Sequence, residues 1–81
     1  MTWTVRWSEV CEADVRRIPW PIAARICASV LEFAESGAGL VERMTLGDPS
    51  LLRLRVRGAA ALVRLDVETR TLSVYRIYAT G

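Results

Sequence analysis

The sequence lacks two residue types that often carry chemistry near neutral pH. Its 81 residues include no histidine and no lysine, so all eleven basic residues are arginines and the formal net charge is +2. Arginine keeps its proton under ordinary conditions, so it can clamp a phosphate or stabilise charge but cannot act as a general base. Acid or base work would therefore fall to Asp, Glu, Cys or Tyr. An arginine-only basic set is equally typical of a GC-rich genome.

Cysteines, metal-ligand clusters and long apolar runs are also scarce. Cys11 and Cys27 belong to no CxxC pair and have no histidine with which to share a metal. We interpret both as small buried apolar residues, with a disulfide or a site as the alternative. No apolar run reaches the roughly 18 residues of a membrane span, no charged leader opens the chain, and no Walker-type loop is present. We therefore expect a cytoplasmic protein with no metal, no cofactor and no membrane partner.

What is present is typical of one small domain over residues 1–81. Of these residues 52% are hydrophobic and 25% are charged, and no tract indicates a disordered arm. Thr2 to Ser8 alternates like a half-buried strand, and Ser8 can cap a helix that ends near Ile18. Pro21 to Gly37 predicts a second helix. The two helices form a hairpin that must bury its apolar stripes against a sheet.

The second half of the chain carries strong strand signals. Leu40 to Met44 is a candidate short strand, and Gly47-Asp48-Pro49 is typical of a turn. From residue 51, leucines alternate with arginines, so the leucines face the helices and the arginines face outward. A two-residue turn at Arg57-Gly58 predicts the cross-strand pairs Val56–Ala59, Arg55–Ala60 and Arg53–Leu62. This register points Ala61, Val63 and Leu65 inward. The same register places four residues on the arginine face, namely Ala60, Leu62, Arg64 and Asp66.

A last strand is predicted over Thr71 to Tyr78, and its facing depends on the turn before it. With a turn at Glu68-Thr69, Tyr75 and Ile77 join the arginine face and Arg76 points inward, whereas a bulge would exchange these positions. Tryptophans pack in the core or the helical hairpin more often than they bind ligands, so this is the expectation for Trp3, Trp7 and Trp20. Asp14 is expected on a solvated helix face.

Several stretches together carry a resemblance to a known family. They are the strand TWTVRWS, the segment ADVRRIPWPIAARICASVLEFAESGAG, the strand and turn LLRLRVRG, and the closing RLDVETRTLSVYRIY, which span about Thr2 to Tyr78. In this order they resemble the RelE/ParE toxins of bacterial type II toxin-antitoxin systems. The resemblance implies an α+β fold, β-α-α-β-β-β, with a helical hairpin packed on a small antiparallel sheet.

The resemblance also implies a function. The family contains ribosome-dependent mRNA endonucleases, which inhibit translation, and inhibitors of DNA gyrase, and a cognate antitoxin neutralises each toxin. In the nuclease branch, basic residues on the second-to-last hairpin hold the RNA backbone. Arg53 and Arg55 match two of these positions and are the candidates for a catalytic role. Arg57, Arg64 and Tyr75 complete the candidate surface for binding nucleic acid or a partner, with a solvated sheet face as the alternative.

The chain departs from the family at three active groups. The family follows the glycine with a tyrosine-arginine pair, whereas this chain reads Ala59-Ala60, so Ala60 stands at the place of a catalytic arginine. After the last strand the family has another arginine and a tyrosine, whereas this chain reads Ala79-Thr80-Gly81. The resemblance therefore implies ribonuclease ancestry and favours a toxin that acts by binding, or a weakened nuclease. The alternative is a non-toxic interaction protein of the same fold, such as a phage-encoded inhibitor of a host defence complex.

Overall fold

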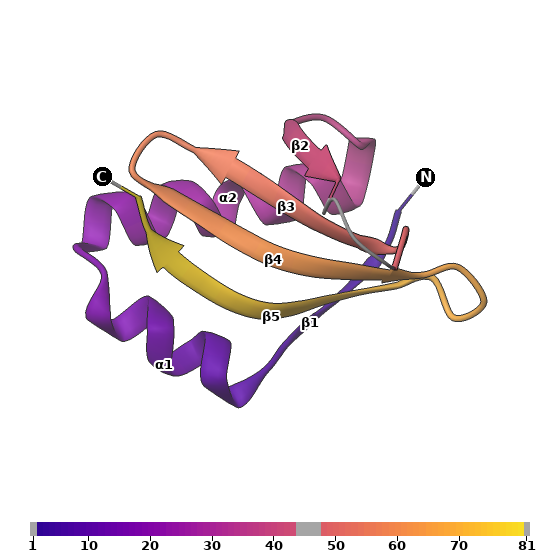
Figure 1. The fold of residues 1–81 in the computed structure, drawn as a ribbon, viewed down its shortest axis with the longest axis horizontal. Coiled ribbons are helices and arrows are strands. Elements are labelled where there is room, and N and C mark those ends of the chain that lie inside the picture. Colours follow the sequence, from indigo (N-terminus) through magenta and orange to yellow (C-terminus); the bar gives the residue numbers. More distant parts are fainter. Residues whose placement is uncertain (1, 44–47, 81) are drawn as a thin grey trace.

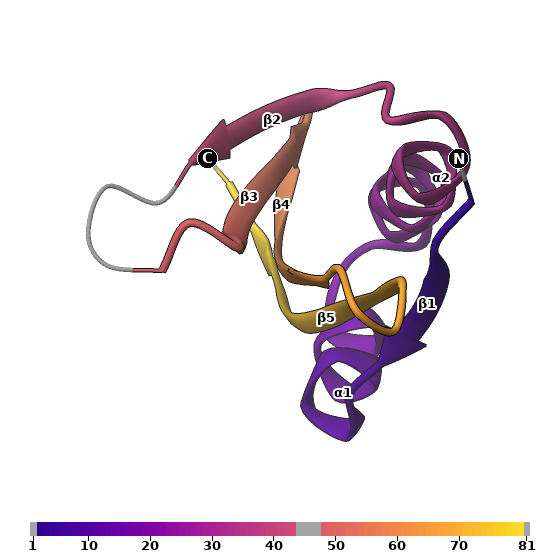
Figure 2. The ribbon, with the colours of Figure 1, turned by 90° about the vertical axis from the view of Figure 1, so that its right-hand side faces the viewer.

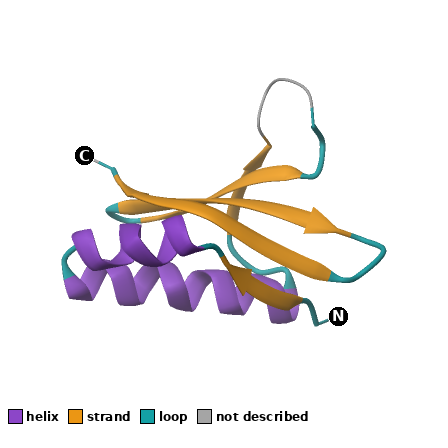
Figure 3. Ribbon diagram, turned by 90° about the horizontal axis from the view of Figure 1, so that it is seen from below, coloured by secondary structure: helices purple, strands orange, loops and turns teal. Residues whose placement is uncertain are grey.

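The computed structural model describes residues 2–43 and 48–80, which form two helices and a five-stranded sheet (Figure 1). In chain order the elements are β1 (Thr4–Trp7), α1 (Glu9–Arg17), α2 (Trp20–Ser36), β2 (Leu40–Arg43), β3 (Leu51–Val56), β4 (Ala59–Asp66) and β5 (Thr71–Ala79). Both helices lie on the same side of the sheet (Figure 3), and the predicted α+β arrangement is confirmed. We call the opposite side the outer face.

The candidate strand at residue 40 is present as β2, which adds one strand to the predicted order. Met44 and Gly47 lie outside the described residues. The turn at Asp48 is confirmed, because the backbone N–H of Ser50 donates to the Asp48 carboxylate at 2.9 Å and the N–H of Leu51 donates to the Asp48 carbonyl at 3.1 Å.

The sheet has the order β1-β5-β4-β3-β2, and it is antiparallel except at β1. β1 pairs in parallel with β5, from Thr4 opposite Thr71 to Trp7 opposite Val74. The sheet, which was expected to be antiparallel, is therefore mixed. The reason is topological. β1 and β5 are the first and last elements of the chain, so no tight turn joins them, and they run side by side in the same direction. β2 lies at the other edge of the sheet (Figure 2).

The helices begin and end largely where their sequence signals lie. Ser8 accepts a hydrogen bond from the N–H of Cys11 at 3.0 Å and caps α1, which gives way to an extended residue at Ile18. α2 starts at Trp20, one residue before the predicted Pro21, and ends at Gly37, whose φ of 78° is left-handed. No helix in the described part of the chain is both long and apolar enough to cross a membrane.

A single apolar layer between the helices and the sheet forms the core. Its largest fully buried side chains are Ile26, Leu54, Leu72, Ile77, Val30, Val63, Val74 and Cys11. Trp3 and Trp7 pack against this layer as predicted, but Trp20 is 77% exposed at the start of α2. The expectation for Trp20 was therefore wrong. The core leaves the outer face of the sheet uncovered by any described helix.

Candidate functional site

The arginine row lies on the outer face of β3, as the alternation predicts. Leu52 and Leu54 are buried against the helices, which turns Arg53 and Arg55 to the opposite side. The predicted hairpin register is confirmed, with Val56 opposite Ala59, Arg55 opposite Ala60 and Arg53 opposite Leu62. The short turn at Arg57-Gly58 therefore fixes which groups neighbour the arginines across the hairpin.

Glu42 on β2 binds both arginines, and sequence reasoning missed it. β2 pairs with β3 so that Glu42 lies opposite Arg53. Arg53 donates from Nη2 to Glu42 Oε2, and Arg55 donates from Nη1 to Glu42 Oε1 at 2.7 Å. These two guanidinium groups hold the pKa of Glu42 below its usual range. The available signal was the candidate strand at Leu40 to Met44, but no local pattern specifies the strand with which it pairs.

A tyrosine on β5 adds to the same cluster. Tyr78 lies opposite Ala60 on one side of β4, and Arg55 lies opposite Ala60 on the other. Glu42 first, and then Tyr78, raise the pKa of Arg53 above its already high value. Ala60 itself is only 1% exposed although its register places it on the outer face. Ala60, at the position for which the resemblance implies a catalytic arginine, is thus a small buried apolar residue between Arg55 and Tyr78.

Arg64 and Tyr75 form a second cluster on the outer face. The Arg64 guanidinium carbon lies 5.5 Å from the centre of the Tyr75 ring, within the range of a cation–π contact. Arg64 also forms an ion pair with Asp48 at 2.9 Å. Beside Tyr75, a hollow of about 220 Å³ is lined by Arg6, Ser8, Ser73, Val74 and Tyr75. Arg57 is exposed at the turn, where its carbonyl accepts a hydrogen bond from Arg25 at 2.8 Å.

A bulge in β5 corrects the predicted facing of the last strand. The register between β4 and β5 shifts between Leu62 and Val63, because Arg76 pairs with Leu62 while Val74 pairs with Val63. The extra residue is Tyr75, which stays exposed. Ile77 is 2% exposed in the core instead of joining the outer face, and Arg76 does not point inward. These two predictions were wrong, and the bulge that would exchange the positions is present.

Arg76 reaches round the edge of β5 to Asp14 on α1. Arg76 donates from Nε to Asp14 Oδ2 at 2.8 Å and from Nη2 to Oδ1 at 3.1 Å, and the N–H of Ile77 donates to Oδ2 at 3.1 Å. Asp14 is only 6% exposed, so the expectation that it lies on a solvated helix face was wrong. The hydrogen bonds from Arg76 are the main cause that lowers the pKa of Asp14.

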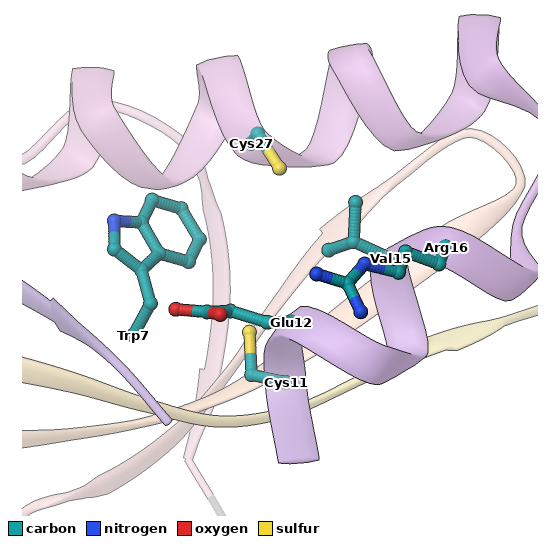
Figure 4. A pocket seen from close by; sticks show the side chains of 6 residues that line it. All are labelled: Trp7, Cys11, Glu12, Val15, Arg16 and Cys27. Carbon is teal, nitrogen blue, oxygen red and sulfur yellow. The ribbon is translucent and has the colours of Figure 1, made fainter. Parts of the chain in front are cut away.

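The helix side of the molecule contains a separate cavity of about 360 Å³ (Figure 4). Cys11 from α1 and Cys27 from α2 both point into it, with Trp7 of β1 at its side. Both cysteines are free thiols. Burial, and to a smaller extent the neighbouring Cys27, raise the pKa of Cys11 to about 11, and burial raises the pKa of Cys27. Two protonated thiols in an apolar hollow are poor nucleophiles, so the cavity offers packing space and no evident chemistry.

The described residues provide no assembled metal site and no histidine-based acid or base. Within residues 2–43 and 48–80, no group of three or more His, Cys, Asp or Glu side chains could hold a metal ion. The outer face instead offers guanidinium groups in two clusters, each with one carboxylate, and one exposed aromatic ring. Such a surface can hold phosphate groups and stack a base or an apolar side chain.

Comparison with solved structures agrees with the fold. No protein-family model matches the chain, and no curated protein matches its sequence. Among solved structures, the toxin–antitoxin complex RelBE2 from Mycobacterium tuberculosis matches with a TM-score of 0.85 and 17% identity, over 99% of this chain and 93% of that chain. A free arginine-to-alanine double mutant of the E. coli toxin RelE matches with a TM-score of 0.77 and 15% identity, over 96% of this chain and 83% of that chain.

Proposed function

We propose, from the premise that this chain has the fold of the RelE toxins, that it is a type II toxin neutralised by a cognate antitoxin in the bacterial cytoplasm. Its target would be an anionic surface of the translation machinery, with ribosome-bound mRNA as the first candidate. The fold itself is compatible with several targets, so the proposal rests on the outer face rather than on the fold.

The observation that carries the proposal is the pair Arg53 and Arg55 on an uncovered sheet face. Both side chains are partly exposed, and Arg57 is exposed at the adjoining turn. Guanidinium groups bind phosphate oxygens with charge-assisted hydrogen bonds, and Tyr75 supplies a ring on which a base could stack. A hollow of about 220 Å³ beside Tyr75 adds depth to an otherwise open surface.

The same face supports binding better than cleavage. Ala60 stands between Arg55 and Tyr78, at the position for which the resemblance implies a catalytic arginine. The two carboxylates that pair with the arginines of this face are weak bases, because two arginines lower the pKa of Glu42, and Ser50 with Arg64 lowers that of Asp48. Loss of one preorganised charge stabiliser costs an enzyme roughly 10²–10³ in rate. We therefore propose a toxin that acts by binding, or a nuclease with strongly reduced activity.

The partner proposal follows from the first structural neighbour, which is a toxin–antitoxin complex. By analogy, this chain would bind an antitoxin encoded next to it. A neighbouring reading frame for a short antitoxin would support this assignment. A phage gene neighbourhood with no such frame would support the alternative of a non-toxic interaction protein, which the alanines at positions 59 and 60 also favour.

Induced expression in a bacterial host, with mapping of transcript 5′ ends, tests the proposal. The wild-type chain is expected to arrest growth, and A60R is expected to add cuts within ribosome-bound codons. R53Q/R55Q is expected to relieve the arrest. The matched control R16Q/R17Q removes the same charge from two exposed residues of α1 and should retain the arrest.

Each other outcome has a defined meaning. Arrest without cuts in both the wild type and A60R would exclude the weakened nuclease and leave a toxin that acts by binding, either on the translation machinery or on a target such as DNA gyrase. Absence of arrest in both would overturn the toxin proposal. Arrest that R53Q/R55Q leaves unchanged would show that the arginine row is only a solvated face.

A further inference from the structure

We propose that Glu42 is an internal occupant of the Arg53–Arg55 pair, which a phosphate group must displace when an anionic partner binds. The inference rests on the proposed function for the nature of the partner, and it adds a control on how tightly that partner is held. In this view the free protein carries its own competitor for the site.

The geometry of the pair supports this reading. Glu42 uses one carboxylate oxygen for each arginine, with Oε2 on Arg53 and Oε1 on Arg55. The register sets this arrangement, since Glu42 lies opposite Arg53 and Arg55 is the next outward residue of β3. Bridging two guanidinium groups with two oxygens is also how a phosphate group would bind them. The carboxylate therefore stands in the place of a phosphate.

With Glu42 bound, one donor of Arg53 is left without a partner in the described part of the chain. Among the described residues, Arg53 Nε is buried and has no hydrogen-bond partner. Both oxygens of Glu42 are already used by the two Nη donors. Phosphate offers more acceptor oxygens than a carboxylate, and an unpaired buried donor is costly. A phosphate that replaced Glu42 could engage this remaining donor as well.

The position of Glu42 makes displacement feasible. The side chains of Glu42, Arg53 and Arg55 are 35%, 37% and 46% exposed, so an incoming group can reach all three. β2 is an edge strand that pairs only with β3 within the described sheet. Ion pairs with this much solvent access are weak and are screened by salt. Polyanion binding can therefore compete with the internal carboxylate.

Asp48 provides an informative contrast. It also binds an arginine of the outer face, Arg64, but it accepts hydrogen bonds from the N–H and the hydroxyl of Ser50 too. Asp48 therefore holds a turn in addition to its ion pair. The hydrogen bonds of the Glu42 side chain in the described chain go to Arg53 and Arg55. Removal of the Glu42 charge should thus alter the site without altering a turn.

The test compares wild type, E42Q, E42A and the control E35Q, which makes the same change at an exposed position of α2. The first probe is inorganic pyrophosphate, followed by NMR of the arginine guanidinium signals. E42Q and E42A are expected to bind it on the order of five- to tenfold more tightly than wild type and E35Q, because one competing charge is gone. E42Q keeps a side-chain amide oxygen that could still accept a hydrogen bond from one arginine, whereas E42A has no such oxygen.

A single-stranded RNA oligonucleotide is the second probe, measured by fluorescence anisotropy across a salt series. For E42Q the slope of log K against log salt should steepen by about 0.7 for each phosphate newly contacted. Equal or weaker pyrophosphate binding by both Glu42 variants would overturn the inference, since Glu42 would then orient the arginines rather than compete for them. A gain for a polyglutamate peptide with none for pyrophosphate would overturn the phosphate assignment.

The two proposals fail separately. If E42Q gains pyrophosphate affinity while expression of the chain never arrests growth, the proposed toxin function fails and the inference on Glu42 stands. If growth arrests but the Glu42 variants gain nothing, the inference fails and the toxin proposal stands. Melting curves of all four proteins are expected to be alike, because Glu42 and Glu35 are both outside the core.

Discussion

Asp14 ties α1 to the part of β5 that lies beyond the end of β1. There the sheet edge offers the N–H of Ile77, and Asp14 accepts it together with two donors of Arg76. A carboxylate that is 6% exposed needs such partners, because an unpaired buried charge is strongly unfavourable. Ser8 contributes at the same edge by donating its hydroxyl to the carbonyl of Tyr75 at 2.9 Å. These polar contacts fix which side chains of the bulged segment point to the core and which point outward.

The first prediction concerns D14N and its pH dependence. The folded pKa of Asp14 is lowered, so its contribution to stability is full above the unfolded value of about 3.9 and is lost as the pH falls through the folded value. D14N should therefore be less stable at neutral pH, by on the order of 1–3 kcal/mol. It should also lose less stability than wild type on acidification. Urea unfolding at a series of pH values checks both expectations.

E35Q is the matched control, because Glu35 is an exposed residue of α2 that undergoes the same carboxylate-to-amide change. It should unfold like the wild type at neutral pH. A D14N protein with the wild-type stability and the wild-type acid profile would contradict the assigned role of Asp14.

The turn between β3 and β4 positions the arginine row relative to α2. Gly58 has a φ of 94°, and a Cβ built there would lie 3.4 Å from two carbon atoms of Ile22. The carbonyl of Gly58 also accepts a hydrogen bond from the N–H of Thr80 at 3.0 Å. The glycine is therefore required for its backbone conformation, whereas the space beside Ile22 would admit a methyl group in van der Waals contact. Any shift here would move Arg55 and Ala60 together.

The second prediction compares G58A with G37A. Both glycines have positive φ, but a Cβ at Gly37 would meet nothing within 4 Å. G37A should therefore show the backbone cost alone, about 1–2 kcal/mol. G58A should lose a similar amount, because its φ of 94° is also strained for alanine while the added Cβ would meet Ile22 at ordinary van der Waals distance. Thermal melts measure both, at roughly 4–8 °C per kcal/mol for a domain of this size.

A loss for G58A well above that for G37A would contradict this expectation and would mean that Ile22 cannot accommodate the added methyl group.

Over the molecule as a whole, the sequence predicted what local signals determine. The Arg57-Gly58 turn set the hairpin register correctly, and Ser8 and Gly37 marked helix ends. The missed features depend on contacts between distant segments. No local sequence pattern predicts that β1 pairs with β5 or that Tyr75 forms a bulge. Nor does any predict that Asp14 binds Arg76, 62 positions away. Glu42 was missed for the same reason, since its partners lie on another strand.

The third prediction uses Cys11 as a probe of global opening. Cys11 is fully buried, and the rise of its pKa from 9.0 to about 11 lowers the thiolate fraction about a hundredfold. In a C27A background, alkylation of Cys11 by iodoacetamide should be at least a hundredfold slower than that of a free thiol. Urea should restore the rate in step with unfolding. Rapid alkylation under native conditions would show that the cavity between the helices opens locally.

The parallel pairing of β1 with β5 has a consequence for synthesis. Thr4 and Thr71 are partners, so β1 has no place in the sheet until residues 71–74 have left the ribosome. Chain elongation at about 5–20 residues per second leaves β1, which ends at Trp7 and follows Trp3, unpaired for several seconds. A nascent chain would thus present no finished outer face. For a protein proposed to act on the translation machinery, this delays activity until β5 has emerged from the ribosome that makes it.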